Sequence, residues 1–187
     1  MRVVGFYTGE KYRSEAEAMK ASAEAVGLVC EISERPDLGT WWKNCNQKSA
    51  FILDCLEKYG DEPILYQDAD TRFVRYPKLL DNLTSDFAAF FNSPTVPIGG
   101  TLWFNGATKA MRYVEPWVLT VQMNPHREDD SINFREALSM TPRPNIKRLP
   151  PSYCWHEGTM RSAYPGVQEV VIEHLNIGSH DYPIIRR

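Results

Sequence analysis

The sequence predicts an α/β fold in which a mainly parallel central sheet is flanked by helices. Two observations carry this prediction. Short apolar runs alternate with amphipathic helical stretches over residues 2–67, which is typical of right-handed crossover units on a parallel sheet. The 187 residues are 43% hydrophobic and show no repeat, low-complexity tract or linker, so both halves of the chain are expected to share one core.

The first two strands and the helix between them follow from local patterns. The β-branched and aromatic run "RVVGFY" predicts a buried strand that stops at Thr8 and Gly9. Ser14 and Glu17 have the spacing of a capping box, and "EAEAMKASAEAV" is rich in helix formers up to the stop at Gly27. "LVCEI" then predicts the second strand.

A second helix and a third strand follow the breaker stretch "SERPDLG". The stretch "WWKNCNQKSAFILDCLEKYG" predicts one helix that ends at Gly60. Its expected buried face consists of Trp42, Cys45, Ser49, Leu53 and Leu56. The apolar run "PILYQ" predicts the third strand, and "DADTR" comes directly after it.

The second half of the chain predicts a different mixture of elements. "DFAAFFN" and "TLWFN" are strand-like and are separated by the loop "SPTVPIGG". "KAMRYVEPWVLTVQM" has helical spacing, but Pro116 is expected to kink or restart the helix. "DDSINFREALSM" predicts a shorter helix, "TPRPNIKRLPPSY" an irregular stretch, and "EVVIEH" a last strand that ends on His174.

Charge and cysteine content limit the classes of function. A formal net charge of −3 and a pI near 5.8 give no global reason to expect nucleic acid or an anionic membrane as partner. The start lacks the apolar region of a signal peptide, and we find no apolar run long enough to span a membrane, so we expect a cytoplasmic protein. The four cysteines form no Cys-x-x-Cys pair and are expected to be reduced, mostly buried thiols.

Two carboxylates, Asp68 and Asp70, stand two positions apart at the end of the third strand. Ligands of open α/β sheets bind at the carboxyl ends of the strands, which places both aspartates, with Thr8 and Gly9, on the expected binding rim. A bend at Ala69 would let both carboxylates face one ion. The alternative is that they merely stabilise a turn, since aspartate favours turns for its own hydrogen bonding.

The order of these motifs resembles that of the nucleotide-diphospho-sugar glycosyltransferases with the A-type (GT-A) fold. "QKSAFILDCLEKYGDEPILYQDADTRFVRYP" is similar to the family's lysine-bearing helix, strand, DxD motif and following proline. "GGTLWFN" is similar to the strand that flanks the donor sugar, "DDSINFREAL" to the acidic helix start, and "RLPPSYCWH" with "VVIEH" to the closing segments. The resemblance spans nearly the whole chain. It departs at Asp129-Asp130-Ser131, where the family usually has Asp-Gln, and in the tail "HLNIGSHDYP", in which His180 has no assigned role.

The resemblance implies a single-domain, Rossmann-like glycosyltransferase over 1–187, with a nucleotide-binding half (1–92) and an acceptor-binding, closing half (93–187). It implies metal-dependent, retaining transfer of a hexose from a nucleoside-diphosphate sugar, with UDP as the expected nucleotide. The acceptor is a hydroxyl group of unknown origin, in a glycan, lipid, protein or modified nucleic acid.

The same resemblance implies a metal site of Asp68, Asp70 and His174. Carboxylates with one imidazole suit Mn²⁺, or Mg²⁺ where oxygen ligands dominate, and such an ion neutralises the charge on a leaving diphosphate. The residues expected to bind the nucleotide sugar are Thr8, Gly9, Lys48, Asp68 and Gly100. Asp129 or Asp130 is the expected catalytic carboxylate, because a helix N-terminus stabilises an ionised carboxylate that faces developing positive charge.

Several of these side chains also have plainer interpretations. His174 ends an apolar strand and is also compatible with a packing histidine, and Lys48 with a solvated lysine. His126 and His156 lie in polar loop sequence and are expected to be solvated. Arg72, more than its neighbour Arg75, is a candidate for contact with the diphosphate or acceptor.

Two other classes of protein remain compatible with the sequence. A metal-dependent phosphohydrolase would use Asp68 as nucleophile and Asp70 as acid and base, although such enzymes carry their motif after the first strand. A non-catalytic domain that binds nucleotide sugars or carbohydrates would keep the fold without turnover. Release of free nucleotide from a donor sugar distinguishes this binding domain from an enzyme.

Overall fold

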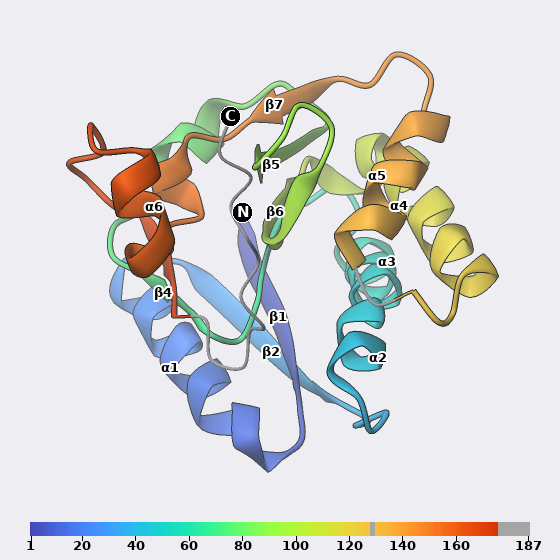
Figure 1. Cartoon of the computed structure of the whole chain (residues 1–187), viewed down its shortest axis with the longest axis horizontal. Helices are drawn as coiled ribbons and strands as arrows, with labels where there is room; N and C mark the ends of the chain where they lie inside the picture. The colour runs from blue at the N-terminus through green and yellow to red at the C-terminus, as the bar shows by residue number, and fades with distance from the viewer. Residues whose placement is uncertain (128–129, 176–187) are drawn as a thin grey trace.

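The computed structural model describes residues 1–127 and 130–175. Its centre is a six-stranded sheet with the strand order β2-β1-β3-β6-β5-β7 (Figure 1). All pairings along this order are parallel except those that β6 makes with β3 and β5, so β6 alone among these strands runs against the others. The α/β fold with a mainly parallel central sheet is therefore confirmed. The strands are β1 (Arg2–Thr8), β2 (Val29–Arg35), β3 (Ile64–Gln67), β5 (Phe87–Phe91), β6 (Pro97–Phe104) and β7 (Ile146–Arg148).

Helices cover both faces of the sheet (Figure 1). One face packs against α3 (Lys48–Tyr59), α4 (Gly106–Met123) and α5 (Asp130–Met140), and the other against α1 (Glu10–Ala25). Shorter helices are α2 (Trp41–Asn46) and α6 (Glu157–Ala163), with 3₁₀ turns η1 (Lys78–Asn82) and η2 (Pro151–Tyr153). In the described part of the chain, no helix combines the length and the apolar character needed to cross a bilayer.

Side chains alternate between the two faces along each strand, which explains why a hydrophobic layer forms on each face of the sheet. In β1, Val4 faces the α3–α5 side while Val3 faces the α1 side, and in β3 Tyr66 and Leu65 divide in the same way. Successive strand residues point to opposite faces of a sheet, so a strand covered on both sides is apolar throughout. This is why "RVVGFY" and "PILYQ" are continuous apolar runs.

A small two-stranded sheet lies beside the main one. It pairs β4 (Thr71–Phe73) with β8 (Ile172–His174), antiparallel, with Thr71 opposite His174. The sequence predicts a last strand ending on His174, and β8 confirms that end. The partner β4 is not predicted, because three residues are too few to show a periodic pattern.

Two helix boundaries differ from the prediction. Helix α1 begins at Glu10, directly after Gly9, whose φ of 71° turns the chain out of β1. Ser14 therefore lies inside the helix and the predicted capping box is wrong. The second predicted helix is broken at Gln47 into α2 and α3, and none of the α2 residues is buried. The single apolar face predicted through Trp42 and Cys45 is wrong for this reason.

Helix α4 continues through Pro116, so the predicted restart is wrong. Proline lacks the N–H that would bond the carbonyl of Arg112, four residues earlier. That carbonyl instead accepts a hydrogen bond from the hydroxyl of Thr141 at 3.2 Å. A contact from outside the helix thus satisfies the group that the proline leaves without a donor.

The proline-rich stretch predicted to be irregular contains one strand. Residues Ile146–Arg148 form β7, which pairs in parallel with β5 at the edge of the sheet. Proline is tolerated next to edge strands because fewer ladder hydrogen bonds are required there. The strand is short and mostly exposed, so it leaves no apolar signal in the sequence.

Candidate functional site

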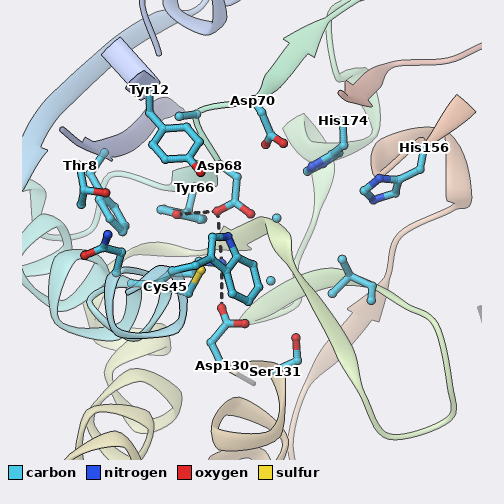
Figure 2. Close-up of a pocket in the computed structure, with 18 of the residues that line it drawn as sticks. Thr8, Tyr12, Cys45, Tyr66, Asp68, Asp70, Asp130, Ser131, His156 and His174 are labelled. Carbon is cyan, nitrogen blue, oxygen red and sulfur yellow. Dashed lines mark hydrogen bonds and ion pairs between the residues drawn. The ribbon is translucent and has the colours of Figure 1, made fainter. Parts of the chain in front are cut away.

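A cavity of about 710 Å³ opens at the carboxyl ends of β1 and β3 (Figure 2). Gly99 and Gly100 reach the same edge because β6 runs in the opposite direction, and the Asp68 N–H donates to the Gly100 carbonyl at 3.0 Å. Residues of α2, α5 and the segment 156–160 complete the wall. The cavity lies where an open α/β sheet binds ligands and has the volume of a small-molecule site.

Asp68 and Asp70 enter this cavity from a turn at the end of β3. The turn is closed by Thr71, whose N–H and hydroxyl both donate to the carbonyl of Asp68, at 3.2 and 2.9 Å. The chain therefore bends at Ala69, the condition under which both carboxylates could face one ion. The backbone of Asp68 makes the turn while its side chain remains in the cavity, so the two interpretations of the motif are compatible.

Pairing of β4 with β8 brings His174 to the aspartates. Thr71 lies opposite His174, and the N–H of Leu175 donates to the carbonyl of Asp70 at 3.0 Å. Figure 2 shows Asp68, Asp70 and His174 together on one side of the cavity. Residues far apart in the sequence are thus brought to one place by a strand pair of three residues each.

Gly100 leaves the space into which Asp68 and His174 both reach. A Cβ atom at position 100 would lie 2.8 Å from Nδ1 of His174 and 3.2 Å from Oδ2 of Asp68. The glycine before it is equally close to charged groups, since a Cβ at Gly99 would meet Nζ of Lys48 at 2.9 Å and Oδ2 of Asp130 at 3.0 Å. The Gly-Gly pair therefore allows charged side chains from three elements to approach the start of β6.

The ring of His174 is buried and held in one orientation. Thr101 donates its hydroxyl hydrogen to Oε1 of Gln67 at 3.1 Å and lies 2.9 Å from Nε2 of His174. The contact between Thr101 and Nε2 leaves Nδ1 as the ring nitrogen that can face a ligand. Burial, with His156 and Lys48 adding to it, holds the pKa of His174 well below its usual value, so the ring is neutral.

Lys48 joins two carboxylates inside the cavity. Its Nζ lies 2.8 Å from Oδ2 of Asp130 and 3.2 Å from Oδ1 of Asp68, and the Tyr66 hydroxyl donates to the same Oδ1 at 2.7 Å. The break at Gln47 makes Lys48 the first residue of α3, at the edge of the sheet. Asp130 is likewise the first described residue of α5.

Burial and charge oppose one another at Lys48. Burial alone would lower the pKa of the ammonium, but Asp130 and Asp68 outweigh it and hold the pKa of Lys48 well above its usual value. Burial, reinforced by Asp68, raises the pKa of the Tyr66 hydroxyl, which therefore stays a hydrogen-bond donor. The interpretation of Lys48 as a solvated lysine is wrong, because its side chain is 5% exposed.

The charged side chains that line the cavity are mainly acidic. Among the described residues, four carboxylates face the cavity, against two permanently cationic side chains, Lys48 and Arg135. The carboxylates are Asp37, Asp68, Asp70 and Asp130. Since Lys48 already contacts two of them, an anionic ligand would meet net negative charge here unless a cation accompanied it.

Most of the other predicted site residues can be placed. Thr8 lines the cavity, whereas Gly9 precedes α1 beside Asp37 and is not among the lining residues described. Asp129 and His180 lie outside the described residues. The suggested ligand contacts of two arginines are not supported, because Arg72 pairs with Glu15 and Arg75 with Glu169.

Two residues of this region were not singled out in the sequence, and the role of a third, His156, was missed. Tyr66 reads as part of an apolar strand, and Gly99 as part of a loop, so neither carries a local signal. The expectation that His126 is solvated is confirmed, but the same expectation for His156 is wrong. Its ring lies 4.9 Å from that of His174, centroid to centroid, within the cavity. The spacing Cys-x-His at 154–156 is the one signal that would have found it.

Sequence comparison detects no relative, since no protein-family model and no curated protein matches the chain. Structural comparison does. The chain is similar to a glycosyltransferase involved in glycosylation of the major capsid of PBCV-1, with a TM-score of 0.66 and 15% identity, over 93% of each chain.

Two further similar structures are also glycosyltransferases. GlyE, a glycosyltransferase of Streptococcus pneumoniae TIGR4, matches with a TM-score of 0.64 and 14% identity over 92% of this chain, which spans 54% of that longer protein. The galactosyltransferase LgtC, in complex with donor and acceptor sugar analogs, matches with a TM-score of 0.61 and 10% identity over 93% of this chain and 86% of LgtC. The chain therefore has the fold of these glycosyltransferases, of the GT-A type.

Proposed function

We propose that this protein is a metal-dependent, retaining glycosyltransferase that moves a hexose from a UDP-sugar to a hydroxyl acceptor. The observation that carries the proposal is the approach of Asp68 Oδ2 and His174 Nδ1 to Gly100 inside the cavity of a glycosyltransferase fold. The complex of the similar LgtC with donor and acceptor sugar analogs supports a sugar donor and a sugar acceptor. We include retention of the anomeric configuration only because the sequence motifs resemble those of the GT-A glycosyltransferases.

The kinds of side chain present suit a divalent cation. Asp68, Asp70 and His174 would hold it, and a pair of carboxylates with a neutral imidazole is a donor set that suits Mn²⁺ or Mg²⁺. The approach of Nδ1 of His174 and Oδ2 of Asp68 to the space left by Gly100 supports this assignment. When bound, such an ion acts as a Lewis acid and neutralises negative charge on the leaving diphosphate.

The acidic lining supports the same conclusion from electrostatics. A nucleoside diphosphate is an anion, and the cavity presents four carboxylates and two cations. Repulsion between ligand and wall would weaken donor binding, since interactions between charges are strong in a partly desolvated cavity. A donor that enters together with a divalent cation avoids this cost.

Lys48 and Asp130 have distinct tasks in the proposed reaction. Lys48 holds Asp68 and Asp130 close together, and its own charge stabilises phosphate oxygens that approach the start of α3. Asp130 is fixed by Lys48 at the first turn of α5, which positions a carboxylate to face positive charge on the sugar ring as the anomeric bond breaks. Thr8, at the end of β1, lines the side of the cavity expected to hold the nucleotide.

Turnover of nucleotide sugars tests the proposal. Purified protein is incubated with UDP- and GDP-hexoses, with Mn²⁺ or with chelator, and release of free nucleoside diphosphate is measured. We expect release from one donor, UDP-linked, in the presence of Mn²⁺. Stabilisation of the protein by a donor without any turnover would indicate a binding domain, and release of inorganic phosphate from simple phosphate esters would indicate a phosphohydrolase.

Asp130→Asn should lower the turnover number by roughly 100-fold with little change in donor affinity, because an amide has a similar shape but cannot stabilise positive charge. The measurement is steady-state kinetics, with donor affinity determined separately by calorimetry. Asp54→Asn, which removes an exposed carboxylate outside the cavity, is the matched control and should behave as the parent. Asp129→Asn is measured in parallel. Small, equal losses in both variants would leave only a helix-capping role for these residues.

A further inference from the structure

Three ligand-type side chains form a cluster at one end of the cavity: Cys154, His156 and His174. Each offers one atom, and these three atoms all lie within 4.8 Å of one another. Figure 2 shows His156 beside His174, on the side away from Thr8. Cys154 and His174 are buried, while His156 is half-buried and lines the cavity. The cluster contains neither Asp68 nor Asp70, but it shares His174 with the metal site proposed for those two aspartates.

Backbone pairing holds the cluster together. Trp155 forms a parallel bridge with Glu173, donates its N–H to the Ile172 carbonyl at 3.0 Å and accepts the His174 N–H at 2.7 Å. In extended backbone, residues two apart point to the same side, so Cys154 and His156 face His174 while the buried Trp155 points away. The three ligand atoms are therefore positioned by main-chain hydrogen bonds.

One separation within the cluster is close to that required by a tetrahedral ion. Sγ of Cys154 lies 3.8 Å from Nε2 of His156. Bonds of about 2.3 Å to sulfur and about 2.0 Å to nitrogen, at a tetrahedral angle, place two such ligand atoms roughly 3.5 Å apart. The other two pairs of ligand atoms also lie within 4.8 Å of each other, so a shift of at most about 1.3 Å would bring each pair to this separation.

We infer that Cys154, His156 and His174 form a binding site for Zn²⁺, or a similarly thiophilic divalent ion, beside the site proposed for Mn²⁺. One thiolate and two imidazoles are ligands that prefer zinc, whereas the carboxylates at Asp68 and Asp70 prefer Mn²⁺ or Mg²⁺. The fourth coordination position faces the cavity and is filled by water or substrate. Burial raises the pKa of the Cys154 thiol, so binding of the ion releases a proton.

This site makes the two metals competitors, a consequence that rests on the proposed function. Thr101 lies 2.9 Å from Nε2 of His174, which leaves Nδ1 as the one ring nitrogen for a metal ion. One nitrogen atom cannot bind Zn²⁺ with Cys154 and Mn²⁺ with Asp70 at the same time. Zinc bound in the cluster therefore inhibits an enzyme that depends on Mn²⁺.

Cobalt spectroscopy tests the site without reference to activity. Co²⁺ added to the intact, reduced protein should produce the near-ultraviolet charge-transfer absorption of a cobalt–thiolate bond, and Zn²⁺ should abolish it by displacing the cobalt. Cys154→Ser should remove the band, while Cys55→Ser, which alters a buried thiol outside the cavity, should keep it. Absence of the band in the parent, or its persistence in Cys154→Ser, would overturn the assignment.

A second variant covers the case in which Cys154→Ser does not fold. His156 is half-buried, so His156→Gln is expected to fold, and it should weaken zinc binding by about 100-fold or more, since loss of outer-shell partners alone costs 10–100-fold. Unchanged zinc affinity in this variant contradicts the site.

Activity in the presence of zinc provides a separate measurement. In the parent, Zn²⁺ should inhibit Mn²⁺-dependent turnover, and Cys154→Ser should raise the half-inhibitory zinc concentration by about tenfold or more. Equal inhibition of both proteins would exclude the cluster as the inhibitory site. A parent that shows the cobalt band but no turnover with any donor would retain the metal site and refute the proposed function, so the two failures are distinguishable.

Discussion

Asp70→Asn should lower Mn²⁺-dependent turnover of the donor sugar by at least about 100-fold, the scale on which even supporting groups affect metal sites, and leave the folded structure unchanged. Asp70 lies in a turn beside His174 and is partly exposed, so an amide of the same size is accommodated. Only the charge that would hold the divalent cation is lost. Turnover and donor affinity are measured with Mn²⁺ varied, and the thermal midpoint reports on the fold.

Removal of the metal from the parent should have the same effect as this substitution. Turnover should nearly stop in chelator and recover fully when Mn²⁺ is restored, and a high Mn²⁺ concentration should recover part of the activity of Asp70→Asn. The Asp54→Asn control, which removes a surface carboxylate, should match the parent under every condition. Full activity in chelator, or an Asp70→Asn variant as active as the parent, would refute metal-dependent transfer and leave the aspartates as turn residues.

The sequence predicts those elements of the fold that are determined by the pattern of apolar and polar residues within one segment. "RVVGFY" and "PILYQ" are apolar along their length because both faces of β1 and β3 are covered. Parallel strands end at the same edge of a sheet, which is why Thr8 and Asp68, expected on one rim, both line the cavity there. No comparison between distant segments is required for either prediction.

The other features of the fold and the site depend on contacts between residues that are far apart in the sequence. Pro116 interrupts a helical pattern, yet Thr141 supplies the hydrogen bond that allows α4 to continue. His156 reads as a loop histidine, but pairing of Trp155 with β8 places it beside His174. The same holds for Lys48: its burial follows from Asp68 and Asp130, which lie on two other elements.

Lys48→Met should destabilise the protein by about 3–5 kcal/mol, the usual effect of removing one partner from a buried ion pair. Methionine replaces much of the lysine volume, so little of the loss comes from a cavity. The cause is electrostatic, because Asp130, with a side chain 8% exposed, would remain close to Asp68 without the ammonium between them. Urea unfolding measures the loss, and Lys58→Met, an exposed lysine paired with Glu31, is the matched control with an expected loss below about 1 kcal/mol.

A double-mutant cycle separates this cause from lost packing. If unpaired charge destabilises Lys48→Met, then Asp130→Asn added to it should recover more than about 1 kcal/mol, because the buried carboxylate no longer carries a charge that needs a partner. In the parent background the same Asp130→Asn change should destabilise, since Lys48 then keeps only the more exposed Asp68 as counter-ion. Asp130→Asn is therefore expected to stabilise the protein when residue 48 is methionine and to destabilise it when residue 48 is lysine. Additive losses across the cycle, or a Lys48→Met protein within about 0.5 kcal/mol of the parent, would show that the ion pair contributes to the site without stabilising the fold.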